Sequence, residues 1–130
     1  MIVVDASVLA VALGDNGTDG GRARDRLAGE TLAAPELIDL DVVSVWRRHV
    51  GAKLMTARRA AAAVSDLEIL PLQRVSHRPL LARIWQLRHG VSPYDAAYVA
   101  VAEALDTVLV TADRRLSRAA GIKCGIEAIA

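Results

Sequence analysis

The sequence predicts an α/β fold in three layers, α/β/α, with a central five-stranded parallel sheet. Short apolar runs recur between longer helical patterns along the whole chain, and this alternation is typical of a parallel sheet covered by helices on both faces. The first run, Ile2-Val3-Val4, is apolar throughout, as a strand buried on both faces must be. At 130 residues, the chain has the usual size of one domain, so we expect a single domain over residues 1–130.

Strands and helices alternate in chain order. We expect strands at 2–4, 32–34, 67–70, 107–111 and 124–129, where apolar runs stand between turn residues. We expect helices near 6–12, 18–28, 36–51, 56–66, 78–89, 94–105 and 113–120. Several of these helical patterns end near a glycine, which is a common helix stop.

The composition fits a folded protein without a membrane span. Hydrophobic residues make up 53% of the chain and charged residues 24%, a balance that favours a packed core over disorder. No apolar run reaches the roughly 18–20 residues of a membrane helix, and no signal peptide precedes the first strand. The one cysteine, Cys124, cannot form an internal disulfide, so nothing requires an oxidising compartment. We therefore expect a cytoplasmic protein.

Charge and aromatic content exclude two classes of nucleic-acid-binding protein. Sixteen cationic and fifteen acidic side chains leave a net charge of +1, so the broad basic surface of a nucleic-acid coat protein is absent. The chain has no Phe, two Trp and two Tyr, too few for the stacking platform of sheet-based RNA readers. Clustered arginines leave local phosphate contacts open, although charge runs usually lie on solvated faces. These clusters are Arg22, Arg24 and Arg26; Arg47 and Arg48; Arg58 and Arg59; and Arg114, Arg115 and Arg118.

Four aspartates are expected at one edge of the sheet. In a sheet of this kind, ligands bind beyond the carboxyl ends of the strands. Asp5 stands where the first strand stops, and Asp113 lies two residues past the fourth. The helix before the fourth strand runs antiparallel to it, which returns Asp95 to the same edge. Asp41 occupies the second turn of the helix after the second strand, within roughly 8 Å of that edge at 1.5 Å per residue.

Two of these acids also have structural explanations to consider. Ser92, Pro93 and Asp95 form a helix-start pattern of N-cap, N1 proline and capping-box acid. Asp113, in the first turn of a helix, would favour the positive end of its dipole. No cation stands at helical spacing from Asp41, Asp95 or Asp113, so intrahelical ion pairs do not explain them. One shared site accounts for four acids at one edge better than separate causes do.

Helical spacing separates Asp41 from its neighbour Asp39. At 100° per residue, Asp41 shares a face with Ser44 and Arg48, opposite the apolar face of the helix. Asp39 is expected to project toward Trp46 instead. Asp41 is therefore the better candidate for the site.

A divalent metal ion would let these carboxylates share a site. Carboxylates brought together repel each other and raise each other's pKa unless a cation neutralises them. Only oxygen ligands are available at these positions, which favours Mg²⁺ or Mn²⁺ over zinc. His49, His77 and His89 show no ligand spacing.

Four segments together carry a family pattern. They are Val3-Val4-Asp5-Ala6-Ser7, Pro35 with Asp41 six residues later, Ser92-Pro93-Tyr94-Asp95-Ala96-Ala97-Tyr98, and Val110-Thr111-Ala112-Asp113-Arg114-Arg115-Leu116. These segments resemble the four motifs of PIN domains and, more narrowly, those of the VapC toxins of bacterial type II toxin–antitoxin pairs. The resemblance extends over nearly the whole chain.

The resemblance implies an endoribonuclease that depends on Mg²⁺ or Mn²⁺ and cleaves structured RNA such as tRNA or rRNA. It also implies a homodimer that is silenced by a VapB-type antitoxin. Asp5 and Asp95 would be the principal metal ligands. Asp41 and Asp113 would act through water, hold a second metal or orient the nucleophile, and metal chemistry of this kind hydrolyses phosphodiesters without a catalytic histidine.

Two hydroxyls and one departure complete the expected site. Ser7 and Thr111 are placed to hold a carboxylate in its rotamer, although Thr111 is equally explained as a helix N-cap. Position 41 is commonly Glu in the family, so Asp41 is one methylene shorter.

Other functions fit less well. A phosphoacceptor receiver domain would need paired acids after the first strand, where Ala6 and Ser7 stand instead. The Asp-x-Asp of a haloacid-dehalogenase-type phosphatase and the Gly-x-Gly-x-x-Gly of a dinucleotide site are both absent from that position. The remaining alternative is a catalytically weak PIN-like module that binds RNA or protein.

Overall fold

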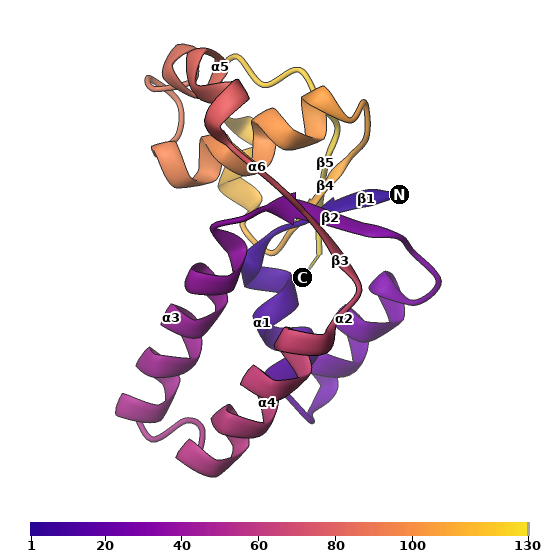
Figure 1. Cartoon of the computed structure of the whole chain (residues 1–130), viewed down its shortest axis with the longest axis vertical. Coiled ribbons are helices and arrows are strands. Elements are labelled where there is room, and N and C mark those ends of the chain that lie inside the picture. Colours follow the sequence, from indigo (N-terminus) through magenta and orange to yellow (C-terminus); the bar gives the residue numbers. More distant parts are fainter. Residues whose placement is uncertain (130) are drawn as a thin grey trace.

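The computed structural model describes residues 1–129 and contains one five-stranded sheet flanked by helices (Figure 1). The strand order is β3-β2-β1-β4-β5, and every neighbouring pair is parallel. The predicted α/β fold with a five-stranded parallel sheet is therefore confirmed. In chain order the elements are β1 (Ile2–Val4), α1 (Ala6–Gly14), α2 (Thr18–Leu27), β2 (Leu32–Pro35), α3 (Ile38–Gly51), α4 (Ala57–Ile69), β3 (Leu72–Val75), the 3₁₀ helix η1 (Arg78–Leu80), α5 (Leu81–Gln86), α6 (Pro93–Ala104), β4 (Leu109–Thr111), the 3₁₀ helix η2 (Arg114–Arg118) and β5 (Ile126–Ala128).

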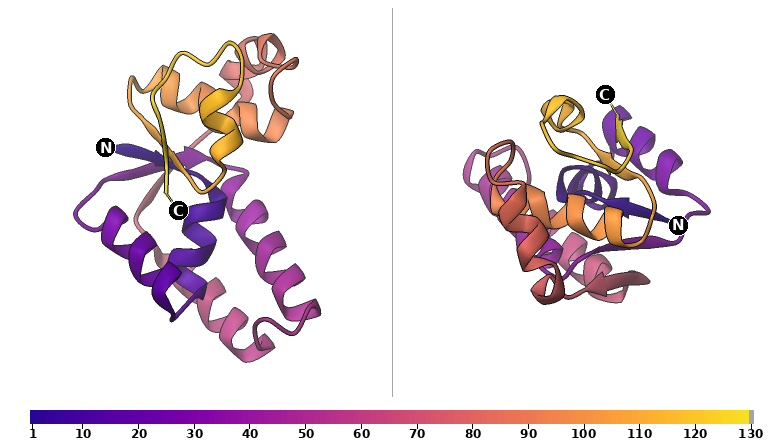
Figure 2. Two further views of the ribbon diagram at one scale, coloured as in Figure 1. Left: turned by 180° about the vertical axis from the view of Figure 1, so that it is seen from behind. Right: turned by 90° about the horizontal axis from the view of Figure 1, so that it is seen from above.

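Helices cover both faces of the sheet. The first four helices lie on one side and α5 and α6 on the other, as Figures 1 and 2 show. α6 is buried from Ala96 to Ala102, and the small side chains in this run let the helix approach the sheet closely. β1 and β4 are buried at every residue. The carboxyl ends of these two central strands therefore meet in the middle of the sheet.

One predicted strand is wrong. Residues 67–70 continue α4, which ends at Ile69, and the third strand instead follows Pro71. The alternation in Leu67-Glu68-Ile69-Leu70 resembles a strand, but Leu67 is buried one helical turn after the buried Ala63, as a helix face requires. β3 is an edge strand with one buried residue, Leu72. Its sequence is therefore too polar to show the apolar pattern of a buried strand.

Two predicted helices are shorter or tighter than expected. The span 78–89 contains η1 and the six-residue α5, and the span 113–120 contains only η2. The other helices begin and end within three residues of their predicted limits. Among residues 1–129, no helix combines the length and apolar character needed to cross a membrane.

Two adjacent glycines in α2 predict opposite effects of the same substitution. A Cβ at Gly20 would stand 1.9 Å from the carbonyl oxygen of Asp15, whereas a Cβ at Gly21 would meet none of the described atoms within 4 Å beyond its own helical neighbours. We expect Gly20→Ala to lower the unfolding temperature, because the backbone must move. Gly21→Ala should raise the free energy of unfolding by about 0.5–1 kcal/mol, because alanine is the better helix former. Urea and thermal denaturation measure both, and equal effects would contradict the close approach at Gly20.

Candidate active site

Asp5 lies at the centre of the predicted site. It follows β1 directly, and its backbone N–H donates to the Val110 carbonyl oxygen at 2.9 Å, which places it beside the end of β4. Its Oδ2 atom accepts hydrogen bonds from the Ser7 hydroxyl at 2.9 Å and the Thr111 hydroxyl at 2.6 Å. Asp5 is only 7% exposed. Burial raises the pKa of its carboxyl, and the hydroxyl hydrogen bonds offset only part of this effect.

The same two hydroxyls connect Asp5 to the segment after β4. Ser7 Oγ accepts from the Ala112 N–H at 3.1 Å, and Thr111 Oγ1 accepts from the Asp113 N–H at 3.0 Å. Thr111 is not the cap of η2, because the side chain of Asp113 occupies that position. Each hydroxyl both donates and accepts, so its orientation is determined and the rotamer of Asp5 is held from two sides.

Asp95 belongs both to a helix start and to the acid cluster. Ser92 Oγ accepts the Asp95 N–H at 3.2 Å as the N-cap of α6, and Pro93 is the first helical residue, as the sequence pattern predicts. Burial raises the pKa of Asp95, and the negative charges of Asp5 and Asp113 raise it further. The capping role therefore leaves the carboxylate within electrostatic reach of two other acids.

Asp41 is held by a residue that sequence reasoning misses. The Tyr98 hydroxyl donates to Asp41 Oδ2 at 2.9 Å, and Tyr98 is 1% exposed. Burial and the nearby Asp41 charge raise the pKa of Tyr98, so its hydroxyl remains a proton donor. The charge of Asp41 also contributes to the raised pKa of Asp5. The sequence signal for Tyr98 is its position three residues after Asp95, on the same helix face.

Asp113 differs from the other three acids because it has a cationic partner. Arg115 Nε donates to Oδ1 at 3.1 Å and Arg115 Nη2 donates to Oδ2 at 2.9 Å. This fork lowers the pKa of Asp113. No cation stands at helical spacing from Asp113, but this acid still has an ion-pair partner, because Arg115 is only two residues away. Residues two apart do not face each other on the α-helix predicted at 113–120, but Asp113 lies outside η2 in extended backbone.

Asp39 lies outside the cluster, but for a different reason than predicted. Its carboxylate is held by the guanidinium of Arg74 on β3, with Nε to Oδ2 at 2.7 Å and Nη2 to Oδ1 at 2.8 Å. The expected approach to Trp46 is wrong. The Trp46 indole N–H instead donates to the Ala10 carbonyl oxygen at 3.1 Å.

The donors available in the cluster fit a hard divalent cation. All four are carboxylates, and within residues 1–129 no Lys or Arg forms an ion pair with Asp5, Asp41 or Asp95. Burial is the main reason why the pKa values of Asp5 and Asp95 are raised, and repulsion from neighbouring acids adds to it. A bound cation relieves such repulsion. No three acidic, His or Cys side chains in the described part of the chain are already gathered into one metal-binding group. A metal would therefore have to draw these carboxylates together.

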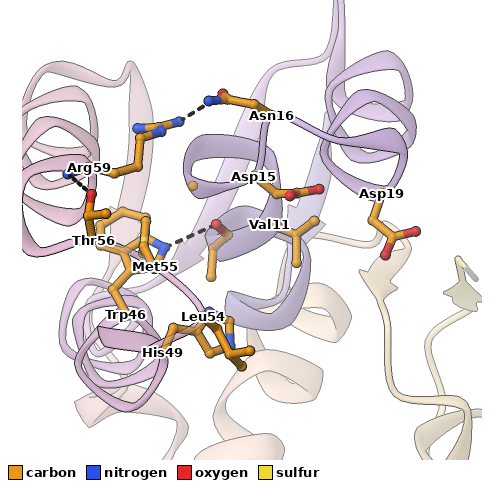
Figure 3. Close-up of a pocket in the computed structure, with 12 residues that line it drawn as sticks. Val11, Asp15, Asn16, Asp19, Trp46, His49, Leu54, Met55, Thr56 and Arg59 are labelled. Atoms are coloured by element: carbon orange, nitrogen blue, oxygen red, sulfur yellow. Dashed lines mark hydrogen bonds between the residues drawn. The ribbon is translucent and has the colours of Figure 1, made fainter. Parts of the chain in front are cut away.

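Two hollows lie in different parts of the molecule. A pocket of about 600 Å³ is lined by residues of α1, α3 and α4, including Trp46, His49 and Arg59, and none of the four acids borders it (Figure 3). A smaller hollow of about 350 Å³ is bordered by Asp95 and Asp113. Two of the four acids, Asp95 and Asp113, therefore open onto the smaller hollow.

The sequence is similar to a known family over nearly its whole length. The family model for the PIN domain matches residues 2–122. Ribonuclease VapC9 of Mycobacterium tuberculosis is 40% identical over 129 residues, which cover 99% of this chain and 98% of the relative. Ribonuclease VapC1 of the same species is 40% identical over 128 residues, covering 98% of this chain and 96% of the relative. The chain therefore belongs to the PIN domain family and, within it, to the VapC ribonuclease toxins.

Solved structures share the fold at lower sequence identity. Mycobacterium tuberculosis VapC20, a sarcin-ricin loop cleaving toxin, aligns with a TM-score of 0.62 at 19% identity, covering 84% of this chain and 87% of that one. VapBC2 from Rickettsia felis, bound to a promoter DNA fragment, aligns with a TM-score of 0.62 at 14% identity, covering 97% of this chain and 98% of that one.

We expect Asp5→Asn to keep the fold and to be more stable than the parent protein at neutral pH without metal. The native pKa of Asp5 lies above its ordinary value of 3.8, so the folded state binds this proton more tightly than the unfolded chain does. The stability that the protonated carboxyl contributes is therefore lost as the pH rises through its native pKa.

Urea unfolding in a chelator, from about pH 4 to about pH 8, measures this difference. The advantage of Asp5→Asn should grow as the pH rises. A variant less stable than the parent at the upper end would show that the hydrogen bonds from Ser7 and Thr111 stabilise the charged carboxylate more than burial penalises it.

Proposed function

We propose that the chain is an endoribonuclease that requires Mg²⁺ or Mn²⁺ and hydrolyses phosphodiester bonds of structured RNA, such as tRNA or rRNA, to inhibit translation and growth. The observation that carries the proposal is Asp5, a buried carboxylate that two hydroxyls hold in place and that interacts electrostatically with Asp41 and Asp95. The full-length likeness to ribonucleases VapC9 and VapC1 supports the same reaction.

The roles of the acids follow from their surroundings. Asp5 and Asp95 would be the direct metal ligands, because Asp113 is already paired with Arg115 and Asp41 is one methylene shorter than the usual Glu. Asp41 and Asp113 would act through water, hold a second metal or orient the nucleophile. When bound, the metal would supply an activated water and neutralise charge at the phosphate.

The neighbouring hydroxyls position these acids. Ser7 of α1 and Thr111 of β4 hold the Asp5 carboxylate, so it does not reorient when a ligand arrives. Tyr98 holds one oxygen of Asp41 and leaves the other open. Such fixed orientation matters in a metal nuclease, because outer hydrogen bonds set the position and basicity of the ligands.

The proposal includes a VapB-type antitoxin and a homodimer as partners. Leu40 of α3 is 76% exposed and Val43 is 39% exposed, so this helix carries apolar surface that a protein partner would cover. VapBC2, which shares the fold, supports an antitoxin as one such partner. We expect the antitoxin to cover apolar helix surface and to place a basic side chain near the acids.

We expect the purified protein to cut RNA only with added Mg²⁺ or Mn²⁺, and chelation to abolish cleavage. Asp5→Asn and Asp95→Asn should each slow single-turnover cleavage by at least roughly 100-fold, as loss of a charge-stabilising group commonly does. In a host cell, the parent chain should arrest growth and create new RNA 5′ ends that Asp5→Asn does not create.

Circular dichroism of the variants controls for unfolding. Full toxicity of a folded Asp5→Asn or Asp95→Asn variant would contradict the assignment of the site. Metal-independent RNA binding without cleavage would instead support a PIN-like binding module.

Asp41 should be less critical than Asp5. Its side chain is shorter than that of Glu by one C–C bond, about 1.5 Å, and Mg²⁺ accepts little variation around a bond length of ~2.0–2.1 Å. Asp41 should therefore reach the metal through water. We expect Asp41→Ala to slow single-turnover cleavage less than Asp5→Ala does, and Asp41→Glu to be tolerated or faster. An Asp41→Ala defect as large as that of Asp5→Ala, with Asp41→Glu inactive, would make Asp41 a direct ligand.

A further inference from the structure

Arg115 is the one cation paired with the acid cluster in the described part of the chain. Its side chain is 86% exposed, although its guanidinium holds both carboxylate oxygens of Asp113. An ion pair so open to water contributes little to stability. The backbone N–H of Arg115 also donates to Asp113 Oδ1 at 2.9 Å. The main chain alone therefore keeps Arg115 beside Asp113 when the guanidinium leaves.

The smaller hollow places Arg115 beside an open space. Asp95, Asp113 and Arg115 border it, together with the loop 90–92 and Leu116. Its volume of about 350 Å³ lies within the range of small-molecule binding pockets.

A close backbone approach maintains one wall of this hollow. A Cβ at Gly90 would stand 2.9 Å from the Ala120 carbonyl oxygen, so a side chain at this position would push the loop 90–92 away from the segment after η2. The hollow therefore combines two acids of the site, one exposed cation and a wall of main chain.

The chemistry of the fork indicates what else Arg115 can bind. A guanidinium that grips both oxygens of a carboxylate has the geometry that also grips two oxygens of a phosphate. A metal ion at Asp113 would compete for the oxygens that Arg115 occupies. Displacement by that metal would release the guanidinium next to the space where RNA would lie.

We infer that Arg115 alternates between two partners: the Asp113 carboxylate in the RNA-free protein, and an RNA phosphate beside the scissile bond when a nucleotide occupies the hollow between the loop 90–92 and η2. This inference rests on the proposed function, which supplies the RNA. Because the same side chain restrains Asp113 and binds RNA, metal and RNA bind cooperatively. A metal that binds Asp113 frees Arg115 for RNA, and an RNA phosphate that binds Arg115 frees Asp113 for the metal. Each ligand therefore raises the affinity for the other, and such coupling is reciprocal.

Arg114 offers a matched control for the test. It lies in the same turn, is exposed, and forms no ion pair within residues 1–129. Arg114→Ala and Arg115→Ala therefore remove the same charge from neighbouring positions. Arg115→Lys keeps the charge and removes the fork. Thermal unfolding of all three variants checks that each remains folded.

The first measurement is Mn²⁺ binding without RNA, by titration calorimetry. We expect Arg115→Ala to bind Mn²⁺ roughly two- to fivefold more tightly than Arg114→Ala does, the range of an exposed ion pair, with Arg115→Lys between the two. A role of Arg115 in supporting the fold would weaken metal binding instead. Equal Mn²⁺ affinities of the two alanine variants would overturn the inference.

The second measurement is binding of a single-stranded oligouridylate in a chelator, where metal-dependent cleavage does not occur. Arg115→Ala should bind it less tightly than Arg114→Ala does, by roughly threefold or more at low salt. The plot of log affinity against log salt should lose about 0.7 in slope relative to the parent, the value for one phosphate contact on a single strand. Arg115→Lys should keep the parent slope.

The outcomes separate the two proposals. If the parent protein binds RNA and cuts it with metal, but Arg115→Ala keeps the parent salt slope, the role of Arg115 is overturned and the proposed function is not. A parent protein that neither binds nor cuts RNA would overturn the proposed function and, with it, the phosphate partner. The Mn²⁺ comparison would then still decide whether Arg115 restrains Asp113.

Discussion

The hydrogen bond from the Thr111 hydroxyl to Asp5, 2.6 Å long, is the contact on which the arrangement of this site depends. It places a carboxylate in a nearly closed space between the ends of β1 and β4, where a charged group without partners would be very unfavourable. Ser7 supplies the second hydroxyl from the first turn of α1. Within residues 1–129, no buried side-chain nitrogen or oxygen lacks a hydrogen-bond partner. The buried polar atoms of the site are therefore all compensated by hydrogen bonds within the protein.

The surroundings of Asp113 set it apart from Asp5 and Asp95. Burial raises the pKa of Asp5 and of Asp95, whereas the guanidinium of Arg115 lowers the pKa of Asp113. Environments that separate the pKa values of neighbouring carboxyls give those carboxyls different chemical tasks. A cation is therefore most favourable beside Asp5 and Asp95, which have no cationic partner within residues 1–129. Asp113 can bind a metal only after the metal replaces Arg115.

The sheet and the positions of the acids could be predicted because strand ends are marked by abrupt changes in polarity. Asp5 after Ile2-Val3-Val4 and Asp113 after β4 are such changes, and the helix start at Ser92 determines where Asp95 lies. These signals are local, and the parallel topology converts them into proximity.

The contacts that could not be predicted are the ones that no local pattern records. The hydrogen bond from Tyr98 to Asp41 joins residues 57 positions apart. The pair of Arg115 with Asp113 depends on a 3₁₀ turn where an α-helix was the simpler prediction. β3 was misplaced because an edge strand needs only one buried side chain, while the end of α4 alternates like a strand.

The placement of β1 between β2 and β4 has a consequence for the way the protein is made. β1 is synthesised before β4, and the hydroxyl of Thr111 that holds Asp5 belongs to a residue 106 positions later. Before β4 is synthesised, the nascent chain therefore has an incomplete sheet, and its Asp5 carboxylate is still open to water. Assembly of the acid cluster is thus one of the last events of synthesis, and a chain terminated before β4 lacks both the Thr111 hydroxyl and the Asp113 carboxylate.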